Sequence, residues 1–392
     1  MPGLLVLMGS GETSPTMVEI HRAAARKLRA GARAVLLDTP YAFQENHADI
    51  SARARRYFAR SVGLEVEVAA AGITGADWVF SGPGSPTYAL DRWAGSGVDG
   101  DLRARVRTRQ GVTVLASAAA CTAGLATVPV YEIYKVGAEP HWRDGLDLLE
   151  PLGLRAVLIP HFDNAEGGTH DTRYCYLGER RLSRMERELP PGTAVLGLDE
   201  HTALIIDLGD ESVRVAGRGG LTVRLPGSAT VLPTGTRTDV AGLRRLAEGG
   251  EAGPAAAAPP SAPAAEPAVT LEESIRACEE QFKAAVAKPD MVAAAQTVLD
   301  LEAEIVKWAA DTEEDTGGVE QGRELVRLLI ARLGELASTA ALRSLVEPLL
   351  TLRATLRQEG RYELADALRE AMLRGGVAVE DTPDGSRWTT AP

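Results

Sequence analysis

The sequence predicts an α/β domain with a mostly parallel sheet flanked by helices, followed by a second, all-α domain. In the first 235 residues, apolar runs of strand length alternate with helical stretches and Gly-rich turns. An Ala- and Pro-rich segment follows, and residues 271–374 are then almost entirely helix-forming. The chain has 392 residues, of which 45% are hydrophobic and 24% charged, which is enough for two or three folded domains.

Five apolar runs in the first domain have the length of buried strands. Each has four or five residues and is bounded by turn-forming or small residues, as in a sheet covered on both faces. These runs are residues 4–8, 34–37, 112–115, 156–159 and 203–206.

Residues 248–267, EGGEAGPAAAAPPSAPAAEP, contain no aromatic or β-branched residue. Such a segment buries too little apolar surface to offset the entropy of ordering it, so it predicts an extended, Pro-stiffened linker. With its flanks included, we assign residues 1–235 to the first domain, 236–270 to the linker and 271–392 to the second domain. We expect the two domains to be separable.

Composition excludes several classes of protein. No apolar run approaches the roughly 20 residues of a membrane-spanning helix, and the N-terminal apolar run has no basic residue before it, as a secretory signal would. The cysteines Cys121, Cys175 and Cys278 lie far apart, so no disulfide framework is expected. We therefore expect a cytoplasmic protein without a membrane partner, and no pattern specifies an oligomeric state.

Three segments of the first domain carry candidate site residues. GVTVLASAAACTAGLA (111–126) is a strand that runs into small residues and a helix, which is typical of a sharp turn that projects one side chain. SGPGSPTYAL (81–90) offers Gly82, Gly84 and Ser85 in a Gly-rich turn that could bind an oxyanion. In AVLIPHFDN, His161 lies just past a strand end, where a histidine can act as base or ligand or simply accept a structural hydrogen bond.

These segments resemble, in order, those of peptidase E and cyanophycinase-type serine peptidases, which have the class I glutamine amidotransferase-like, flavodoxin-like fold. The resemblance covers about residues 1–235, and LIPHFDN and GLDEHTAL (197–204) match best. It implies a serine-type peptidase or amidohydrolase that acts on a small amide- or peptide-bearing ligand. It also implies His161 as the base and Glu132, in VPVYEIYKVG, as the nearest match to the third catalytic residue. Asp199 and Glu200 are interpreted as turn residues.

The nucleophile segment departs from the family pattern. Aligning GVTV on the family's GVPV places Ala118 at the position of the nucleophilic serine. Three alternatives remain: Ser117 attacks from a shifted turn, Cys121 attacks from the first helical turn, or the chemistry is lost and a ligand-binding pseudo-enzyme remains.

Two histidines and three carboxylates lie within eleven residues in HFDNAEGGTHD (161–171). Their spacing matches no strong metal motif, so we predict no metal, and no motif calls for another cofactor.

The C-terminal segment LVEPLLTLRATLRQEGRYELADALREAMLRGGVAVEDTPDGSRW (345–388) resembles the end of cysteinyl-tRNA synthetases. The resemblance covers about residues 271–392 and implies a helical, anticodon-binding region with a small strand-containing tip. The chain has no HIGH-like or KMSKS-like sequence, so it cannot charge tRNA by itself. The matching positions are Tyr362, Ala365, Asp366, Leu368, Arg369, Asp381, Thr382, Pro383, Gly385 and Trp388.

Four arginines are the candidates for tRNA contact: Arg353, Arg357, Arg361 and Arg369. On an unbroken helix they would form one stripe, whereas a break at Gly360 would scatter them. From residue 271 onward, 23 acidic side chains outnumber 14 basic ones, and the whole chain has a net charge of −12. The overall charge repels phosphate, so a protein partner is the alternative to tRNA. Two functions remain: a hydrolase with a binding tail, or an inactive ligand-binding adaptor.

Overall fold

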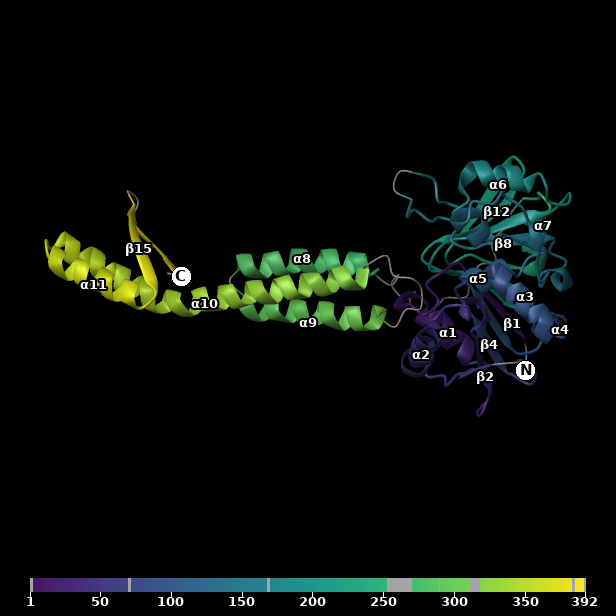
Figure 1. Ribbon diagram of the computed structural model, residues 1–392, viewed down its shortest axis with the longest axis horizontal. Coiled ribbons are helices and arrows are strands. Elements are labelled where there is room, and N and C mark those ends of the chain that lie inside the picture. The colour runs from purple at the N-terminus through teal and green to yellow at the C-terminus, as the bar shows by residue number, and fades with distance from the viewer. Residues whose placement is uncertain are drawn as a thin grey trace. The chain divides into compact units, whose positions relative to one another are not determined.

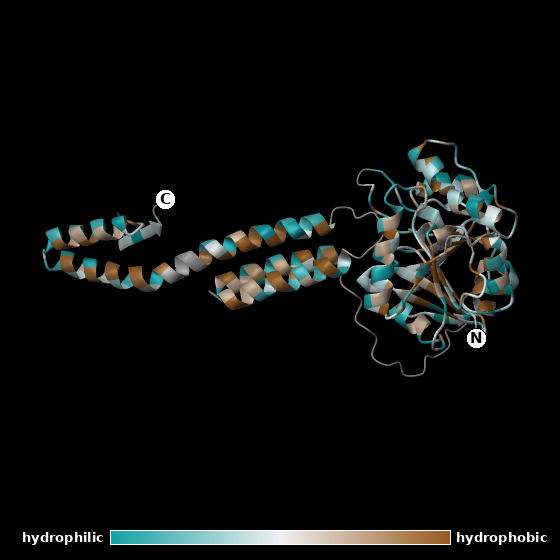
Figure 2. Ribbon diagram, turned by 60° about the horizontal axis from the view of Figure 1, so that its bottom comes forward, coloured by the Kyte–Doolittle hydropathy of each residue, from teal (hydrophilic) through white to brown (hydrophobic). Residues whose placement is uncertain are grey.

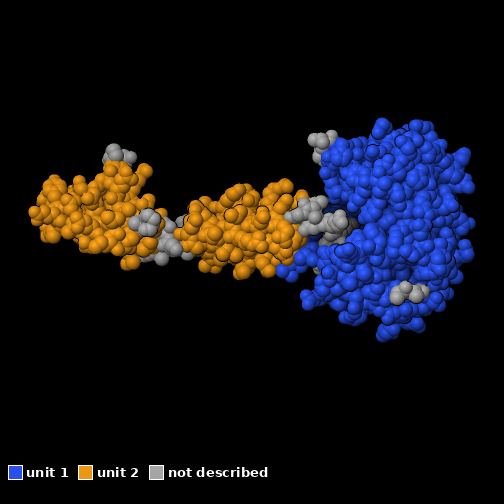
Figure 3. Space-filling model, viewed as in Figure 1, with its two compact units in different colours: residues 1–270, 306–316 blue, residues 271–305, 317–392 orange. Residues whose placement is uncertain are grey.

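The computed structural model describes residues 3–69, 72–167, 170–251, 270–288, 290–309, 318–382 and 385–390 (Figure 1). The chain forms two compact units (Figure 3). Unit 1 contains residues 1–270 and 306–316, and unit 2 contains residues 271–305 and 317–392. Most of the predicted linker, residues 252–269, lies outside the described residues.

Unit 1 is built on an eight-stranded sheet with the order β14-β11-β10-β1-β5-β4-β2-β3. The five strands from β1 to β3 in this order are parallel, which confirms the predicted α/β class with a parallel-rich sheet. Three antiparallel strands extend the β1 edge. The bounds are β1 (Leu4–Met8), β2 (Ala34–Leu37), β3 (Glu67–Val68), β4 (Trp78–Ser81), β5 (Val112–Ala116), β10 (Thr202–Asp207), β11 (Ser212–Gly217) and β14 (Arg237–Asp239).

Alternate side chains of these strands enter two separate cores, because successive residues of a strand point to opposite faces. Leu4, Val6 and Met8 pack under α1 (Val18–Ala25) and α2 (His47–Tyr57). Leu5 and Leu7 pack on the other face, under α3 (Pro86–Ser96), α4 (Val98–Arg107) and a second sheet. In Figure 2 the strands inside this domain are mostly brown, whereas the helices around them alternate brown and teal.

The second sheet has four strands in the order β13-β12-β9-β8, with β8 and β9 parallel. Its outer face packs against α6 (Gly178–Glu186). The strands are β8 (Ala156–Ile159), β9 (Ala194–Leu198), β12 (Gly220–Leu225) and β13 (Ser228–Pro233). Shorter elements are η1 (Pro15–Met17), η2 (Thr39–Tyr41), η3 (Phe58–Val62), α5 (Ser117–Cys121), β6 (Ala126–Thr127), η4 (Tyr131–Lys135), β7 (Arg143–Asp144) and η5 (Glu150–Leu152).

The predicted start of the linker at residue 236 is wrong, because the chain continues as β14 and then as α7 (Val240–Ala247). β14 pairs with β11, and the Asp239 carboxylate caps α7 by accepting the Gly242 N–H at 2.6 Å. Val240, Leu243 and Leu246 are buried in the main core. This buried apolar face makes residues 237–247 part of the first domain.

Unit 2 begins with a helical bundle of α8 (Leu271–Ala287), α9 (Met291–Trp308) and the first part of α10 (Gly318–Gln358). Its core contains Phe282, Ala294 and Val298. The end of α10 then packs with α11 (Tyr362–Arg374), β15 (Val377–Thr382) and β16 (Gly385–Thr390). The predicted helical region with a strand-containing tip is confirmed. Within the described ranges, no helix is both long and apolar enough to cross a membrane.

Of the two arrangements left open for the four arginines, the structure shows the one in which a break at Gly360 scatters them. α10 ends at Gln358, Gly360 has a φ of +76°, and α11 starts a new helix at Tyr362. Arg353 is only 1% exposed, and its two terminal nitrogens donate to the two Asp381 carboxylate oxygens at 2.6 and 2.9 Å. Arg353 therefore holds the hairpin formed by β15 and β16 against α10, and it is not available to contact phosphate.

The three other arginines are exposed. Arg357 also donates to Asp381, at 3.2 Å, while Arg361 lies 3.6 Å from a Glu359 oxygen. Hydrogen bonds from Arg353 and Ser386 lower the pKa of Asp381, so the Asp381 carboxylate stays ionised.

Candidate active site

Ser117 is the first residue of α5 and lies at the sharp turn where β5 passes directly into that helix. Ala116 is still extended, and Ser117 has a φ of +46°, which costs a non-Gly residue about 1–2 kcal/mol. The next residues, Ala118, Ala119 and Ala120, are buried, so larger side chains would not fit there. The run of small residues thus forms the predicted turn, with Ser117 at its apex.

The Ser117 side chain is hydrogen-bonded to His161, whose other ring nitrogen is bonded to Glu200. The distance from Ser117 Oγ to His161 Nε2 is 2.8 Å, and that from His161 Nδ1 to Glu200 Oε1 is 2.9 Å. An ionised carboxylate can only accept, so Nδ1 carries the proton and Nε2 accepts from the Ser117 hydroxyl. This is the order of contacts that activates a serine nucleophile.

Strand pairing explains why these three residues meet. β8 and β9 are parallel with Ile159 opposite Gly197, so His161 and Glu200, which follow the two strands, leave the same edge of the small sheet. The His161 N–H donates to Gly9 O at 3.3 Å, just past the end of β1. β1 pairs in turn with β5, which carries Ser117.

Glu200 is surrounded by groups that orient it and favour its charge. Asn164 Nδ2 donates to Glu200 Oε1 at 3.2 Å. The backbone N–H of Glu200 donates to Asp163 Oδ1 at 2.7 Å. Burial raises the pKa of Glu200, but the hydrogen bonds from His161 and Asn164 and the charge of His161 outweigh it, and the net pKa is lowered. By contrast, burial raises the pKa of the neighbouring Asp199 to about 6, despite a hydrogen bond from Gly220.

Glu132, the predicted third residue, is not bonded to His161. Its Oε1 accepts the Thr87 hydroxyl at 2.6 Å instead. Glu200 holds the position that sequence reasoning gave to Glu132, so its interpretation as a turn residue was incomplete. Glu200 follows β9 just as His161 follows β8. This position directly after a strand is the signal in the sequence that points to Glu200.

Of the three alternatives for the nucleophile, the structure brings Ser117 to His161. Cys121 is 1% exposed, its Sγ accepts the Thr127 hydroxyl at 3.2 Å, and burial raises the pKa of its thiol. Ala118 lies one residue beyond the turn and has no nucleophilic atom.

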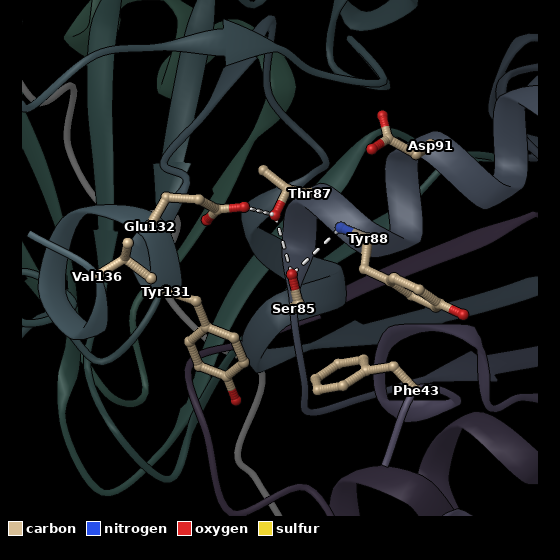
Figure 4. Close-up of a pocket in the computed structure, with 8 residues that line it drawn as sticks. All are labelled: Phe43, Ser85, Thr87, Tyr88, Asp91, Tyr131, Glu132 and Val136. Atoms are coloured by element: carbon tan, nitrogen blue, oxygen red, sulfur yellow. Dashed lines mark hydrogen bonds between the residues drawn. The ribbon is translucent and has the colours of Figure 1, made fainter. Parts of the chain in front are cut away.

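The predicted oxyanion loop lies against this turn. Gly82 O accepts the Ala119 N–H at 3.1 Å. Gly84 has a φ of +127°, and a Cβ there would lie 2.1 Å from Pro40 O, so only glycine fits. Ser85 has a structural role instead. Its N–H donates to Pro40 O at 2.8 Å, and its Oγ caps α3 by accepting the Tyr88 N–H (Figure 4).

The acidic segment after His161 is engaged in local contacts. Glu166 accepts the Tyr176 hydroxyl at 2.6 Å, and Asp171 pairs with Arg173 at 2.8 Å. Across the described ranges, no three His, Cys, Asp or Glu side chains are grouped so that they could hold a metal ion.

No family model matches the chain, but short segments of it match curated proteins. A cysteine–tRNA ligase of Carboxydothermus hydrogenoformans is 46% identical over 43 residues, 11% of this chain and 9% of the ligase. That of Dehalococcoides mccartyi is 32% identical over 98 residues, 24% of this chain and 21% of the ligase. The chain thus spans only 9% to 21% of the length of these curated relatives.

Among the solved structures that resemble part of this chain are two with low sequence identity. One is a peptidase from an acI-B1 Actinobacterium, with 19% identity and a TM-score of 0.47, covering 61% of this chain and 97% of the peptidase. The other is a putative peptidase E protein from Listeria monocytogenes EGD-e, with 11% identity and a TM-score of 0.37, covering 59% of this chain and 99% of that protein.

Proposed function

We propose that the α/β domain is a serine hydrolase that cleaves an amide or peptide bond in a small ligand. Ser117 is the nucleophile, His161 the general base and acid, and Glu200 the residue that orients His161. The observation that carries this proposal is the continuous hydrogen-bonded series from Ser117 Oγ through the His161 ring to the Glu200 carboxylate, at 2.8 and 2.9 Å.

The reaction follows from these contacts. Ser117 Oγ attacks the substrate carbonyl carbon while its proton passes to His161 Nε2, and the ionised Glu200 stabilises the resulting imidazolium. The backbone N–H of Ala118, in the first turn of α5, and those of the Gly82–Gly84 loop are the candidates to bind the oxyanion. His161 then donates the proton to the leaving amine, and a water molecule hydrolyses the acyl-enzyme by the same steps.

A fluorophosphonate probe tests this proposal on the full chain. We expect covalent labelling of the native protein, located at Ser117 by peptide mass spectrometry and lost on unfolding, because only the folded turn brings Ser117 to its base. Ser96→Ala, at an exposed serine in α3, is the control and should label like the unchanged protein. No labelling, or a label on another residue, would favour the inactive, ligand-binding adaptor instead.

We further propose that unit 2 binds tRNA, on the basis of the 43-residue match to a cysteine–tRNA ligase. Arg353 has a structural role, because it donates two hydrogen bonds to the Asp381 carboxylate. Arg357 also donates to Asp381. The two other candidates, Arg361 and Arg369, are exposed, and we propose that they contact phosphate. A protein partner is the competing function, supported by the excess of acidic side chains.

Reversing these two charges should weaken tRNA binding. We expect the full chain to bind tRNA weakly and with a steep salt dependence, and Arg361→Glu with Arg369→Glu to flatten the log–log salt slope by about 1.5, which corresponds to two lost phosphate contacts. Arg323→Glu, near the start of α10, is the control. Affinity measured over a salt series gives the slope, and absence of binding at low salt would decide for the protein partner.

A further inference from the structure

β13 forms one edge of the small sheet, and its outer side is open. Among the described strands it pairs with β12 alone, in an antiparallel ladder. Five of its six residues are exposed, and the exposed fraction of Val231 is 59%. A strand at the edge of a sheet presents a row of backbone N–H and C=O groups, which can pair with a strand from another chain.

The other edges of the two main sheets are protected in ways that natural proteins commonly use. β14 and β3, at the two edges of the large sheet, have only three and two residues, and β14 carries the charged Arg237 and Asp239. β8, at the opposite edge of the small sheet, is buried throughout. Around β13, by contrast, residues 225–236 include no charged residue, although 24% of the chain is charged. β13 therefore lacks the features that keep an edge strand from pairing.

Two residues of β13 direct both of their backbone polar groups away from β12. Pro233 has no N–H, so its pair with Gly220 is not of the hydrogen-bonded kind, in which both residues donate. Gly220 bonds on its other side instead, where its O accepts the Asp199 N–H at 3.2 Å. Because the two kinds of pair alternate along an antiparallel ladder, Ala229 and Val231 also face outward. Their N–H and C=O groups contact no partner within the described ranges.

A second copy of β13 can satisfy all of these groups. With Thr230 opposite the second copy's Thr230 across a twofold axis, Ala229 lies opposite the second copy's Val231, and Val231 opposite its Ala229. Each of these two pairs exchanges two N–H···O bonds, so all four outward groups of each copy are used. The exposed Val231 side chain also gains a cross-strand neighbour in Ala229. The edge is thus complementary to itself, as a twofold dimer interface requires.

Neighbouring registers fit less well. With Val231 opposite itself, Ala229 would lie opposite Pro233, which has no N–H to donate. The Pro233 O is also engaged already, because it accepts the Thr236 N–H at 3.0 Å. The register centred on Thr230 is therefore the one that the strand favours.

We propose that β13 is a dimerisation edge, at which two copies of this chain pair antiparallel about Thr230 and join their four-stranded small sheets into one of eight strands. The inference requires neither the proposed hydrolase nor tRNA binding. The six residues of β13 span about 20 Å, so this pairing buries less surface than a standard interface of about 1,600 Å². The net charge of −12 on each copy opposes association as well. The dimer is therefore weak, with a Kd of about 1–100 µM.

Sedimentation equilibrium of the full chain over a concentration series tests the dimer. We expect a reversible monomer–dimer equilibrium, and Val231→Lys should raise its Kd at least about tenfold, because it places two like charges on the paired edges. Val231 is exposed in the monomer, so the melting temperature of the dilute variant should not fall. Ala104→Lys, at an exposed position in α4, adds the same charge elsewhere and should leave the Kd within about twofold. A chain that stays monomeric above this concentration range would overturn the proposal and leave an extended peptide of another protein as the occupant of the edge. A dimer that Val231→Lys does not weaken would overturn it too.

Cysteine cross-linking checks the register. Directly opposed residues in a non-hydrogen-bonded pair have Cα atoms about 4.5 Å apart, which suits a disulfide, so Thr230→Cys should link two copies under mild oxidation. Ser228→Cys is the matched control, because in this register it lies four residues, about 13 Å, from its own copy. The native cysteines are buried and should not react. Equal cross-linking of both variants, or cross-linking through Ser228→Cys alone, would overturn the proposed pairing.

Discussion

Ser117→Ala should abolish fluorophosphonate labelling and lower amide hydrolysis by a factor on the order of 10³ or more. The reason is that Ser117 Oγ is the atom bonded to His161, and a nucleophile and its base act as a unit. The measurement is the release of a fluorescent amine from a panel of aminoacyl amides by the full chain, with the melting temperature as the test of folding.

Ala118→Ser provides the matched variant for this experiment. Residue 118 is the position that the family alignment assigns to the nucleophile, yet it lies one residue past the turn, within α5. Added to Ser117→Ala, Ala118→Ser should therefore restore neither labelling nor hydrolysis. Restored activity in the double variant would show that the turn presents residue 118 to His161 and that the alignment, not the observed geometry, identifies the active position.

Glu200→Gln should lower kcat by roughly 10²- to 10⁴-fold with little change in KM. Glutamine removes the charge that stabilises a protonated His161, and its amide can donate to Nδ1, which would favour the wrong tautomer. Steady-state kinetics on a neutral amide substrate measure the loss.

Glu132→Gln is the control, because Glu132 contacts Thr87 and not His161. It should leave kcat for a neutral substrate unchanged. Equal losses in both variants would contradict the assignment of Glu200 and would restore Glu132 as a candidate for the third position.

The sequence predicted the architecture and two of the three residues in the hydrogen-bonded series, but not Glu200. Ser117 and His161 each follow an apolar strand in a distinctive local pattern. Glu200 reaches His161 only because β8 and β9 pair in parallel with a particular register, which is a long-range property. The position of Glu132 in the chain predicts it as the third residue, but its hydrogen bond with Thr87, 45 residues away, holds it away from His161.

Similar reasons explain the two errors outside the site. Arg353 looked like a phosphate ligand because arginines in a helix are usually solvated, but its partner Asp381 comes from a hairpin 28 residues later. The predicted linker begins too early because α7 is only eight residues long, and the stability of α7 comes from Leu243 and Leu246, which pack into the main core of the first domain. Helix periodicity over so short a segment gives little signal.

The left-handed conformation of Ser117 places backbone strain at the centre of the candidate site. A backbone with a φ of +46° is most stable with glycine, so Ser117→Gly would relieve the strain but remove the hydroxyl. The chain instead keeps a hydroxyl where folding disfavours one, beside a histidine that is itself held at a φ of +47°. Strain of this kind lowers the stability of the folded chain and is common where a side chain has to be held in one orientation.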